Sequence, residues 1–284
     1  MDSHPQGRLY LCGTPIGNLE DVTLRGLSTL REVDYIAAEN ISRTRKLLSR
    51  YDIHRPLLTY REEEREKQGA AILALIMQGR SVALVSDAGM PGLSDPGHDL
   101  VVRCRAEGID VTAVPGPSAV LTALVLSGFS TARFVFEGFL PRKRQKREEL
   151  LKELAAEKRT VIFFEAPHRL RATLEECARF LSGRRLCIAR ELTKAFEELT
   201  WGTPDELLSN QADGQARGEI TIVLEGASPD AESGEKEPAD IGTMIDEYER
   251  KGFSLKDAAR EISRATGLGR REIYEKGLKR EGKK

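Results

Sequence analysis

The stretch Val82-Ala-Leu-Val-Ser-Asp-Ala-Gly-Met-Pro-Gly-Leu-Ser-Asp-Pro-Gly97 contains the clearest fold signal in the chain. Its apolar, partly β-branched start, residues 82–85, is typical of a buried parallel strand that ends at Ser86. The loop that follows is rich in glycine and proline and contains two carboxylates, Asp87 and Asp95. Loops of this kind, at the carboxyl ends of strands, are the usual ligand sites of α/β sheets. An ordinary turn after a core strand gives the same pattern, so this loop needs support from others.

Apolar strand-like runs recur along the chain, and helical patterns lie between many of them. The strand-like runs cover residues 9–12, 35–38, 82–85, 111–114, 134–136, 161–164, 186–189 and 220–224. The helical patterns include residues 70–77, 119–126, 148–156 and 170–181. Alternation of this kind predicts an α/β fold with largely parallel sheets.

The body of the chain divides at residues 127–131, Ser-Gly-Phe-Ser-Thr, into two halves of ordinary domain size. We therefore predict an N-terminal α/β domain over residues 1–128 and a second α/β domain over residues 129–226. An acidic linker over residues 227–240 then leads to a basic module over residues 241–284.

The net charge of −1 hides an uneven distribution. Residues 225–240 hold six acidic residues against one lysine, which is typical of a solvated linker. Residues 241–284 hold twelve Lys or Arg against eight Asp or Glu. Because the whole chain is not basic, any nucleic-acid binding has to rest on local patches.

The four cysteines, Cys12, Cys104, Cys177 and Cys187, are scattered and form no C-x-x-C pair. Reduced, buried thiols in a cytoplasmic protein are therefore expected, rather than a zinc site or a disulfide framework. The first residues lack the apolar core of a leader peptide, and no run approaches the about 18 apolar residues of a membrane span. We expect a cytoplasmic protein with no metal and no membrane contact.

Two more loops follow apolar strands in the same way. Gly13-Thr-Pro-Ile-Gly-Asn18 is neither a P-loop nor a dinucleotide-binding loop and is predicted as a tight strand-to-helix turn. Val114-Pro-Gly-Pro-Ser-Ala-Val120 has Pro117 near a helix start, which leaves backbone N–H groups near Ser118 and Ala119 free to bind acceptors. We expect the three loops to meet in one crevice.

In this order and spacing, residues 13–18, 86–97 and 115–120 resemble the S-adenosylmethionine (SAM) loops of the tetrapyrrole methylase superfamily. Four motifs of the second half narrow the resemblance to its ribosomal RNA branch, the 16S rRNA (cytidine-2′-O)-methyltransferases. They are Phe136-Glu-Gly-Phe-Leu-Pro141, Phe164-Glu-Ala-Pro-His-Arg169, Ala189-Arg-Glu-Leu-Thr-Lys-Ala-Phe-Glu-Glu198 and Gly218-Glu-Ile-Thr221. The resemblance covers residues 9–224, and the basic tail also fits that branch.

The resemblance implies two α/β domains with SAM bound between them, a homodimer, and 16S rRNA in the 30S subunit as the substrate. It also implies cofactor contacts from all three loops and from the second domain. These are Pro15, Ile16, Asp87, Ala88, Gly89, Met90, Ser118, Ala119, Leu192 and Ile220. The chemistry of the ligand agrees, because adenine favours apolar walls, and a carboxylate such as Asp87 suits a cationic sulfonium.

A basic segment follows the Gly-Phe-Leu-Pro turn, with five positive charges in residues 142–147. Such a segment is often only a solvated helix start, and a phosphate-binding patch is the functional alternative. The predicted RNA-contacting residues are Arg142, Lys143, Arg144, Lys146, Arg147, His168 and Arg169. His168 has another possible role, as an ordinary loop histidine that caps the following helix.

Transfer of a methyl group to a ribose hydroxyl requires alignment of donor and acceptor and a base that takes the hydroxyl proton. The predicted catalytic residues are Glu191 and Lys194, the latter if desolvation or the neighbouring Arg190 lowers its pKa. His168 and Glu197 are the weaker alternatives. Without such a role, the charged residues of this segment are surface ion pairs of little energetic value.

The tail is predicted to form three short helices. Ile241, Met244, Ile245 and Tyr248 form a helical stripe, and Ser254-Leu-Lys-Asp257 is typical of a capping box that opens a second helix. Gly267-Leu-Gly269 indicates a turn, and residues 270–279 form a basic third helix. This order resembles a helix-turn-helix, although a three-helix packing or dimerisation module has the same pattern.

Two other functions fit parts of this evidence. A SAM enzyme that methylates a small tetrapyrrole or precorrin shares the three loops but needs neither the basic segment nor the basic tail. A non-catalytic regulator uses the tail to bind nucleic acid and the body to sense a ligand. Binding to rRNA separates the first from an RNA methyltransferase, and methyl incorporation separates the second.

Overall fold

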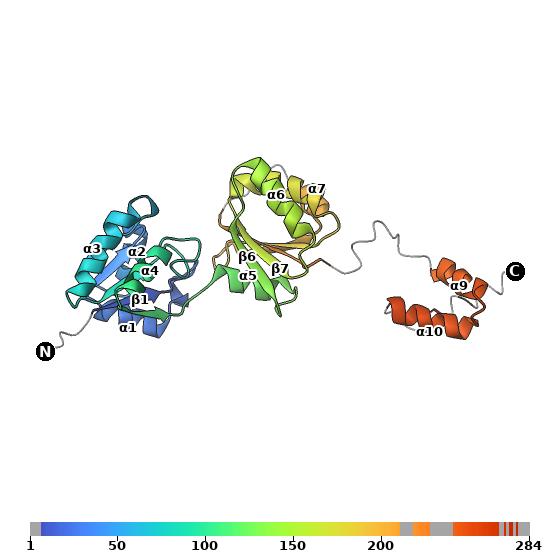
Figure 1. The fold of residues 1–284 in the computed structure, drawn as a ribbon, viewed down its shortest axis with the longest axis horizontal. Helices are drawn as coiled ribbons and strands as arrows, with labels where there is room; N and C mark the ends of the chain where they lie inside the picture. Colours follow the sequence, from blue (N-terminus) through green and yellow to red (C-terminus); the bar gives the residue numbers. More distant parts are fainter. Residues whose placement is uncertain are drawn as a thin grey trace. The chain divides into compact units, whose positions relative to one another are not determined.

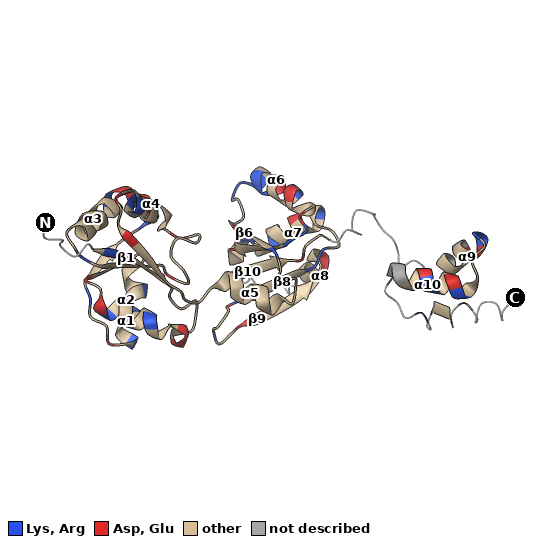
Figure 2. Cartoon of the chain, turned by 60° about the horizontal axis from the view of Figure 1, so that its bottom comes forward, with Lys and Arg blue, Asp and Glu red and all other residues tan. Residues whose placement is uncertain are grey.

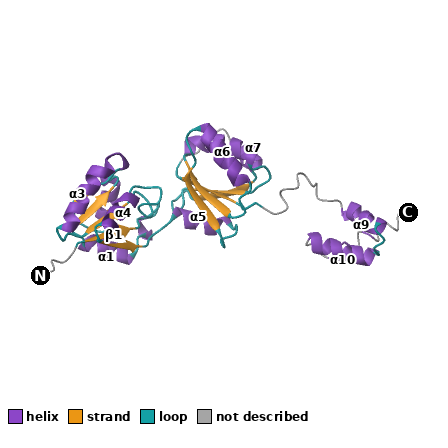
Figure 3. Ribbon diagram, in the orientation of Figure 1, coloured by secondary structure: helices purple, strands orange, loops and turns teal. Residues whose placement is uncertain are grey.

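The computed structural model describes residues 7–210, 218–227 and 241–266, together with residues 270, 273, 274 and 277. The chain forms two compact units, Met1–Ala227 and Ser228–Lys284. The first unit contains two five-stranded sheets with helices packed on them (Figure 1; Figure 3). The α/β class predicted from the alternating pattern is confirmed. None of the helices in these ranges has the length and apolar character that a membrane span requires.

The first sheet is fully parallel and has the strand order β3-β2-β4-β1-β5. Its strands are β1 (Arg8–Cys12), β2 (Tyr35–Ala38), β3 (Leu57–Thr59), β4 (Val82–Val85) and β5 (Asp110–Val114). All four residues of β4 are buried, as an apolar strand in the middle of a parallel sheet requires.

Four helices cover this sheet, two on each face. They are α1 (Leu24–Glu32), α2 (Ile41–Arg50), α3 (Arg65–Met77) and α4 (His98–Ala106), and the short 3₁₀ turns η1 (Leu19–Asp21) and η2 (Glu62–Glu64) precede α1 and α3. α1 and α2 pack on one face through Leu27 and Leu48. α3 and α4 pack on the other face through Ile72 and Leu100. After β1 the chain crosses to β2 on one side, and after β4 it crosses to β5 on the other side. The neighbouring strands β1 and β4 therefore form a topological switch point, which is where α/β sheets bind ligands.

The second sheet is mixed and has the strand order β6-β7-β10-β8-β9. Its strands are β6 (Phe134–Phe139), β7 (Thr160–Glu165), β8 (Leu186–Arg190), β9 (Glu198–Gly202) and β10 (Ile220–Leu224). β6 and β7 are parallel, whereas β10 is antiparallel to β7 and β8, and β8 is antiparallel to β9. The predicted parallel arrangement therefore holds for the first sheet only. The segment between β8 and β9, residues 191–197, is too short for the crossover that a parallel pair needs.

Helices also cover both faces of the second sheet. α6 (Arg144–Ala155), α7 (Leu170–Phe180), which follows the 3₁₀ turn η3 (Pro167–Arg169), and α8 (Pro204–Asn210) pack on one face, and α5 (Ala119–Ser127) packs on the other. α6 and α7 contribute Leu151 and Leu174 to an apolar core that also contains Phe163 of β7.

α5 differs from the prediction in the sheet that it covers. Its Leu124 packs with Ile162 and Val223, which belong to β7 and β10 (Figure 1). The boundary predicted at residues 127–131 assigned this helix to the first domain. The structure corrects that assignment, because the apolar side of α5 is buried against the second sheet. The division between the two sheets therefore lies at residues 115–118.

The C-terminal unit contains α9 (Ile241–Arg250) and α10 (Leu255–Thr266), whose shared core includes Ile245, Ala258, Ala259, Ile262 and Ile273. The predicted capping box is confirmed, since the Asp257 N–H donates to Ser254 Oγ at 3.2 Å and the Ser254 hydroxyl donates to Asp257 Oδ2 at 2.6 Å. The predicted turn at residues 267–269 and most of the third helix, residues 270–279, lie outside the described residues. The helix-turn-helix therefore stays a prediction.

Candidate active site

A cavity of about 390 Å³, here called the central cavity, lies between the loops of the first sheet and strands β7 and β10 of the second. The loops are loop 1 (residues 13–18), loop 2 (residues 86–97) and loop 3 (residues 115–118, leading into α5). The lining includes Ile16 from loop 1, Asp87 to Met90 and Leu93 to Asp95 from loop 2, Ser118 to Val120 from loop 3 and α5, and Phe164 to Pro167, Leu192 and Gly218 to Thr221 from the second half. The three loops thus meet in one crevice, which has the size of a small-molecule pocket.

Backbone hydrogen bonds fix loop 1 against loop 2. The Thr14 N–H donates to the Gly89 carbonyl at 2.9 Å, and the Gly89 N–H donates to the Thr14 carbonyl at 3.0 Å. The Thr14 hydroxyl also donates to the Ser86 carbonyl at 3.2 Å. Gly89 has a φ of +78°, a conformation that residues with a side chain rarely adopt. The pairing of the two loops therefore depends on glycine at this position.

Loop 1 and loop 3 touch through two glycines. A Cβ atom at Gly13 would lie 2.7 Å from the Gly116 Cα, and a Cβ atom at Gly116 would lie 2.8 Å from the Gly13 Cα. Neither position has room for a side chain, because backbone atoms obstruct both, and at Gly13 the Met90 Sδ atom also lies 2.8 Å from the Cβ position. The close approach keeps loop 1 and loop 3, which follow the paired strands β1 and β5, in contact.

α5 begins at the edge of the central cavity. Ser118 is its N-cap, and its side chain accepts a hydrogen bond from the Leu121 N–H at 3.4 Å. The N–H groups of Ala119 and Val120, in the first turn, have no intrahelical acceptor. Together with the positive end of the helix dipole, these donors suit a carboxylate or another acceptor in the cavity.

Asp87 presents a carboxylate to the central cavity. Its Oδ1 is buried and has no hydrogen-bond partner within the described part of the chain, and its Oδ2 lies 3.7 Å from Arg43 Nη1. Burial raises the pKa of Asp87 above its usual value, and the charge of Arg43 and a hydrogen bond from the Asn40 N–H to this carboxylate offset that rise only in part. A buried carboxylate oxygen without a partner is energetically costly, so it fits a site for a positively charged ligand.

Two more carboxylates add to the negative charge here. Asp95 lines the cavity, and burial, assisted by the charge of Glu39, raises its pKa to about 6. Burial and the charge of Asp87 likewise raise the pKa of Glu39. Asp95 belongs to a loop that the sequence singles out, whereas Glu39 follows β2 without any glycine or proline signal.

Nine of the ten predicted cofactor-contacting residues line the central cavity. They are Ile16, Asp87, Ala88, Gly89, Met90, Ser118, Ala119, Leu192 and Ile220. The tenth, Pro15, lines a smaller hollow of about 80 Å³ that shares Asp87 and Arg43 with the central cavity.

The cavity also contains residues that the sequence analysis missed. These are Arg43, Phe139, Phe164, Glu165 and Glu219. Phe139, Phe164, Glu165 and Glu219 belong to motifs of the resemblance but had no assigned role. Arg43 has the pattern of an exposed position on an amphipathic helix, so only the packing of α2 beside loop 2 reveals it.

Glu191 and Lys194, the predicted catalytic residues, do not line the cavity. Lys194 Nζ lies 2.7 Å from Glu191 Oε1 and 3.2 Å from Glu219 Oε2. Partial burial lowers the pKa of Lys194, but the hydrogen bonds and charges of Glu191 and Glu219 outweigh it, so the pKa is raised overall. The hydrogen bond from Lys194 lowers the pKa of Glu191. Lys194 therefore bridges Glu191 and Glu219 in an ion-pair group of which only Glu219 lines the cavity, and the catalytic role of Glu191 and Lys194 stays a prediction.

The turn that carries this pair has an unusual backbone. Glu191 and Thr193 have φ values of 51° and 64°, in the left-handed region that favours glycine. Thr193 Oγ1 accepts a hydrogen bond from the Asn18 N–H of loop 1 at 3.0 Å, and the Thr193 N–H donates to Glu197 Oε2 at 2.6 Å. Such strain is typical of functional sites, and here it connects the β8–β9 turn with loop 1.

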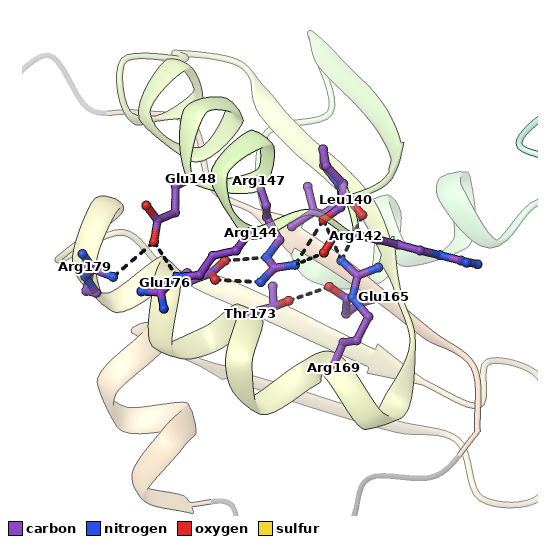
Figure 4. A network of polar contacts seen from close by, with 11 residues as sticks. Leu140, Arg142, Arg144, Arg147, Glu148, Glu165, Arg169, Thr173, Glu176 and Arg179 are labelled. Carbon is purple, nitrogen blue, oxygen red and sulfur yellow. Dashed lines mark hydrogen bonds and ion pairs between the residues drawn. The ribbon is translucent and has the colours of Figure 1, made fainter.

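A buried network supports the other end of the site (Figure 4). Arg147 forms two hydrogen bonds with Glu176, at 2.5 and 2.7 Å, and donates to the Pro141 carbonyl at 3.1 Å. Arg169 Nε lies 3.2 Å from Glu165 Oε1, and Arg169 also donates to the Leu140 carbonyl at 2.9 Å. Both arginines therefore hold the segment that precedes α6.

This network corrects part of the predicted RNA surface. The Arg147 side chain is 9% exposed and bonded to Glu176, so it has no free donor face for a phosphate. Arg169 is 17% exposed and is similarly occupied by Glu165. The other predicted contacts are exposed: Arg142, Lys143, Arg144 and Lys146 stand at the start of α6, which carries blue Lys and Arg segments in Figure 2, and His168 stands in η3. Arg144 also forms an exposed ion pair with Glu148 at 2.9 Å.

Metal ligands and reactive thiols do not gather near the cavity. Within the described ranges, no group of three or more His, Cys, Asp or Glu residues could hold a metal ion. All four cysteines are buried and unpaired, and burial raises the pKa of Cys12 to about 12. Thiols of this kind are inert packing residues.

The sequence model of the family described as Tetrapyrrole (Corrin/Porphyrin) Methylases matches residues 8–208. Solved structures similar to this chain include a uroporphyrin-III C-methyltransferase from Thermus thermophilus complexed with S-adenyl homocysteine. It has a TM-score of 0.56 and 17% identity, over 77% of this chain and 97% of that one. The methyltransferase CobJ has a TM-score of 0.59 and 20% identity, over 78% and 95%. These likenesses show the fold.

Relatives with higher identity carry the name Ribosomal RNA small subunit methyltransferase I. The relative from Halalkalibacterium halodurans is 42% identical over 95% of this chain and 94% of its own length. The relative from Thermotoga maritima is 50% identical over 78% of this chain and 99% of its own length. The chain therefore belongs to the tetrapyrrole methylase family and, within it, to the small subunit ribosomal RNA methyltransferases I.

Proposed function

We propose that this protein transfers the methyl group of SAM to the ribose 2′-hydroxyl of a cytidine in 16S rRNA of the 30S subunit. The names of relatives that are 37–50% identical over most of the chain support an rRNA substrate. The observation that carries the proposal is the central cavity, where a carboxylate oxygen without a hydrogen-bond partner among the described residues and the first turn of α5 meet apolar walls. Methylation of a small tetrapyrrole is not favoured, since the methylases of known structure that act on such compounds share only 17–20% identity.

The residues of the cavity fit SAM in charge and shape. Asp87 has a buried oxygen that lacks a partner and suits a positive group. Ala119 and Val120 have free N–H groups that suit a carboxylate or the adenine edge. Ile16 and Ile220 offer apolar contact from the two halves of the unit. The close packing of Gly13 and Gly116 keeps the loops in place before the ligand arrives.

Bound SAM supplies an activated methyl group on a cationic sulfur. The protein has to exclude water, align the ribose hydroxyl and accept its proton as the new bond forms. We assign proton acceptance to Glu219 on position alone: of the Glu191–Lys194–Glu219 group only Glu219 lines the cavity, where Arg43 and Lys194, each 3.2 Å from one of its oxygens, hold its carboxylate in place. Glu191 and Lys194 act as positioning residues, since Lys194 bonds both carboxylates and Glu191 accepts a hydrogen bond from the Glu219 N–H at 2.9 Å.

RNA is bound in this proposal by the exposed cations at the start of α6. Arg142, Lys143 and Lys146 have the exposure that phosphate contacts require, and His168 is exposed in the η3 turn after β7. Phosphate contacts of this kind fix the position of the nucleic acid without reading its sequence. The choice of nucleotide therefore rests on the walls of the cavity.

The exposed apolar side of α5 is the feature that favours a homodimer. This helix, Ala-Val-Leu-Thr-Ala-Leu-Val-Leu-Ser, contains no charged residue, and one side of it is exposed. Leu121, Val125 and Leu126 are 52%, 65% and 42% exposed. Trp201, 43% exposed, joins this side by donating from its indole N–H to the Ser127 carbonyl at 2.8 Å. An apolar face of this kind suits burial against a second copy.

The test is methyl transfer from isotopically labelled SAM to 30S subunits lacking this modification. We expect label in 16S rRNA, and mass spectrometry of nuclease digests should locate it on a cytidine ribose. Asp87→Asn should weaken SAM binding at least tenfold in calorimetry, because it removes the charge that faces the sulfonium. Label in no RNA fraction, or unchanged SAM affinity in the variant, would contradict the proposal.

A further inference from the structure

α2 is the most basic helix of the N-terminal half, and the proposed function leaves it unexplained. Residues Ile41–Arg50 contain Arg43, Arg45, Lys46 and Arg50 and no acidic residue. By contrast, α3 together with the preceding η2 turn contains four glutamates beside its two cations. The charge of α2 is therefore a local feature.

All four cations lie on the outward half of the helix. Thr44, Leu47 and Leu48 are buried and hold α2 on the sheet. The helical spacing of Arg43, Lys46 and Arg50 aligns them along one line, which is about 10 Å long because each residue adds about 1.5 Å along the axis. Every exposed residue of this helix is polar, since Ser42 and Ser49 complete its outer surface.

This line of charge begins at the central cavity. Arg43 lines the cavity, and its guanidinium lies 3.2 Å from Glu219 Oε1 and 3.7 Å from Asp87 Oδ2. On the other flank, Arg45 borders an open hollow of about 510 Å³ together with Ser49, His54 and Arg55. α2 therefore links the mouth of the cavity to a basic depression on the surface.

Nearby acids leave most of this charge uncompensated. Arg50 pairs with Glu20 at 3.8 Å, but both side chains are more than half exposed, and such pairs contribute little. Arg55 donates to the Arg31 carbonyl, which leaves its charge in place. Among the described residues, no acidic group lies within ion-pair distance of Arg45 or Lys46.

We infer that α2 and the adjoining hollow form a second RNA-binding surface, which holds phosphates of the strand that leads into the central cavity. The inference rests on the proposed function. Arg, Lys and Ser side chains are the groups that proteins use for phosphate contacts, and arginine binds phosphate in a bidentate manner. A protein partner fits less well, because the core of a protein interface is apolar, whereas the exposed residues of α2 are all polar and Leu48 and Ile53, which also line the hollow, are buried in the core.

The experiment compares two charge-reversed variants of the full-length protein. The test variant, R45E/K46E, changes exposed residues of α2 and spares Arg43. The matched control, K67E/R105E, changes exposed residues of α3 and α4, which cover the opposite face of the same sheet. Both variants change the net charge by the same amount. The probe is 16S rRNA transcribed in vitro, and its affinity is measured over a range of salt concentrations beside calorimetric binding of SAM.

We expect the test variant to bind this RNA roughly tenfold or more weakly, with a salt slope reduced by about 1.5, since two phosphate contacts are lost. The KM for 30S subunits should rise, while SAM affinity and melting temperature stay at wild-type values. The control variant should keep both RNA affinity and slope. Equal losses in the two variants, or a wild-type slope in the test variant, would overturn the inference. If the wild-type protein binds the RNA but transfers no methyl group to 30S subunits, the proposed function fails, and the binding comparison still decides the role of α2.

Discussion

The carboxylates of the central cavity are held in surroundings that disfavour their charged forms. Asp87 has a buried oxygen without a partner in the described residues, and burial raises the pKa of Asp95 to about 6. Neither arrangement stabilises the ligand-free protein at neutral pH. Both become favourable when a cation occupies the cavity, which is the pattern of perturbed acids that marks functional sites.

We expect SAM to bind more tightly as the pH rises from 5 to 7.5. With a pKa of about 6 in the folded protein, Asp95 is ionised in roughly a tenth of the molecules at pH 5 and in nearly all of them at pH 7.5. Because the sulfonium favours the ionised form, the apparent affinity should rise up to about tenfold. Calorimetric titrations with SAM across this pH range measure the effect.

Asp95→Asn is the control for this profile. The variant should lose most of the pH dependence of SAM binding. The raised pKa also fixes the sign of the stability effect: the contribution of Asp95 is most favourable below its ordinary pKa of 3.8 and is lost as the pH rises through about 6. The ligand-free variant should therefore be more stable than the wild-type protein at pH 7.5. Identical pH profiles for the two proteins would argue against this role of Asp95.

The sequence predicts site residues well where the signal is local. Asp87, Gly89 and Ser118 directly follow apolar strands, so the expected edge of the sheet brings them together. Arg43 and Glu219 reach the cavity only through the packing of α2 and β10, which leaves no mark in a local pattern. Neither a loop signal nor a family resemblance shows whether a charged side chain already forms an ion pair within the folded protein.

At the scale of elements, the Arg147–Glu176 network holds the segment that connects β6 and α6 (Figure 4). The carbonyls of Leu140, Pro141 and Arg142 all accept hydrogen bonds from Arg147 or Arg169. The exposed cations of residues 142–146 come directly after these held carbonyls in the chain. The buried Arg147–Glu176 pair therefore determines the position of these cations. Arg147, which the sequence analysis predicted to contact RNA, therefore holds the neighbouring segment in place instead.

Arg147→Ala should destabilise the protein by about 3–5 kcal/mol, because Glu176 is then left buried without its cation. The double variant R147M/E176L removes both charges and should regain much of that loss. Unfolding in urea measures both free energies. The salt slope of RNA binding should stay unchanged in the double variant, since Arg147 has no free donors. A reduced slope would mean either that Arg147 itself contacts RNA or that the exposed cations which the pair positions have moved.

The sequence also predicts elements unevenly. Buried strands such as β4 and β10 are predicted because each is an almost uninterrupted run of apolar residues. By contrast, β9 is missed because Glu198–Gly202 is polar at its start and lies at the edge of the sheet. α5 is found as a helix, but its apolar residues surround it on all sides. A helix without a polar face does not indicate which sheet it covers.

At the scale of the whole molecule, the exposed face of α5 predicts the assembly. L121E/V125E should convert a dimer to monomers, because it introduces charges into a face that a second copy would bury. Sedimentation or light scattering measures the mass. The matched control is M77E/V102E, whose apolar side chains are 63% and 53% exposed on α3 and α4. A dimer that persists in L121E/V125E would assign the interface to another surface.

A chain that ends at Ala227 should fold and bind SAM as the full-length protein does, because Met1–Ala227 is a compact unit by itself. Turnover should stay within about twofold, while the KM for 30S subunits rises severalfold, since a tethered basic module raises the local concentration of RNA-binding groups. Steady-state kinetics with labelled SAM separate the two parameters. An unchanged KM would show that the tail does not contribute to RNA binding.

The chain passes from the first sheet to the second once within the described residues, and it does so through loop 3, which is itself a wall of the central cavity. A ligand in that cavity touches both halves on either side of this single covalent link, so both halves share its stabilisation. At a hundredfold excess over its dissociation constant, a ligand adds about 2.7 kcal/mol against unfolding. Proteases in a cell degrade the unfolded fraction. We therefore expect the lifetime of this protein in a cell to shorten when SAM is scarce, so that starvation for SAM depletes the enzyme as well as its substrate.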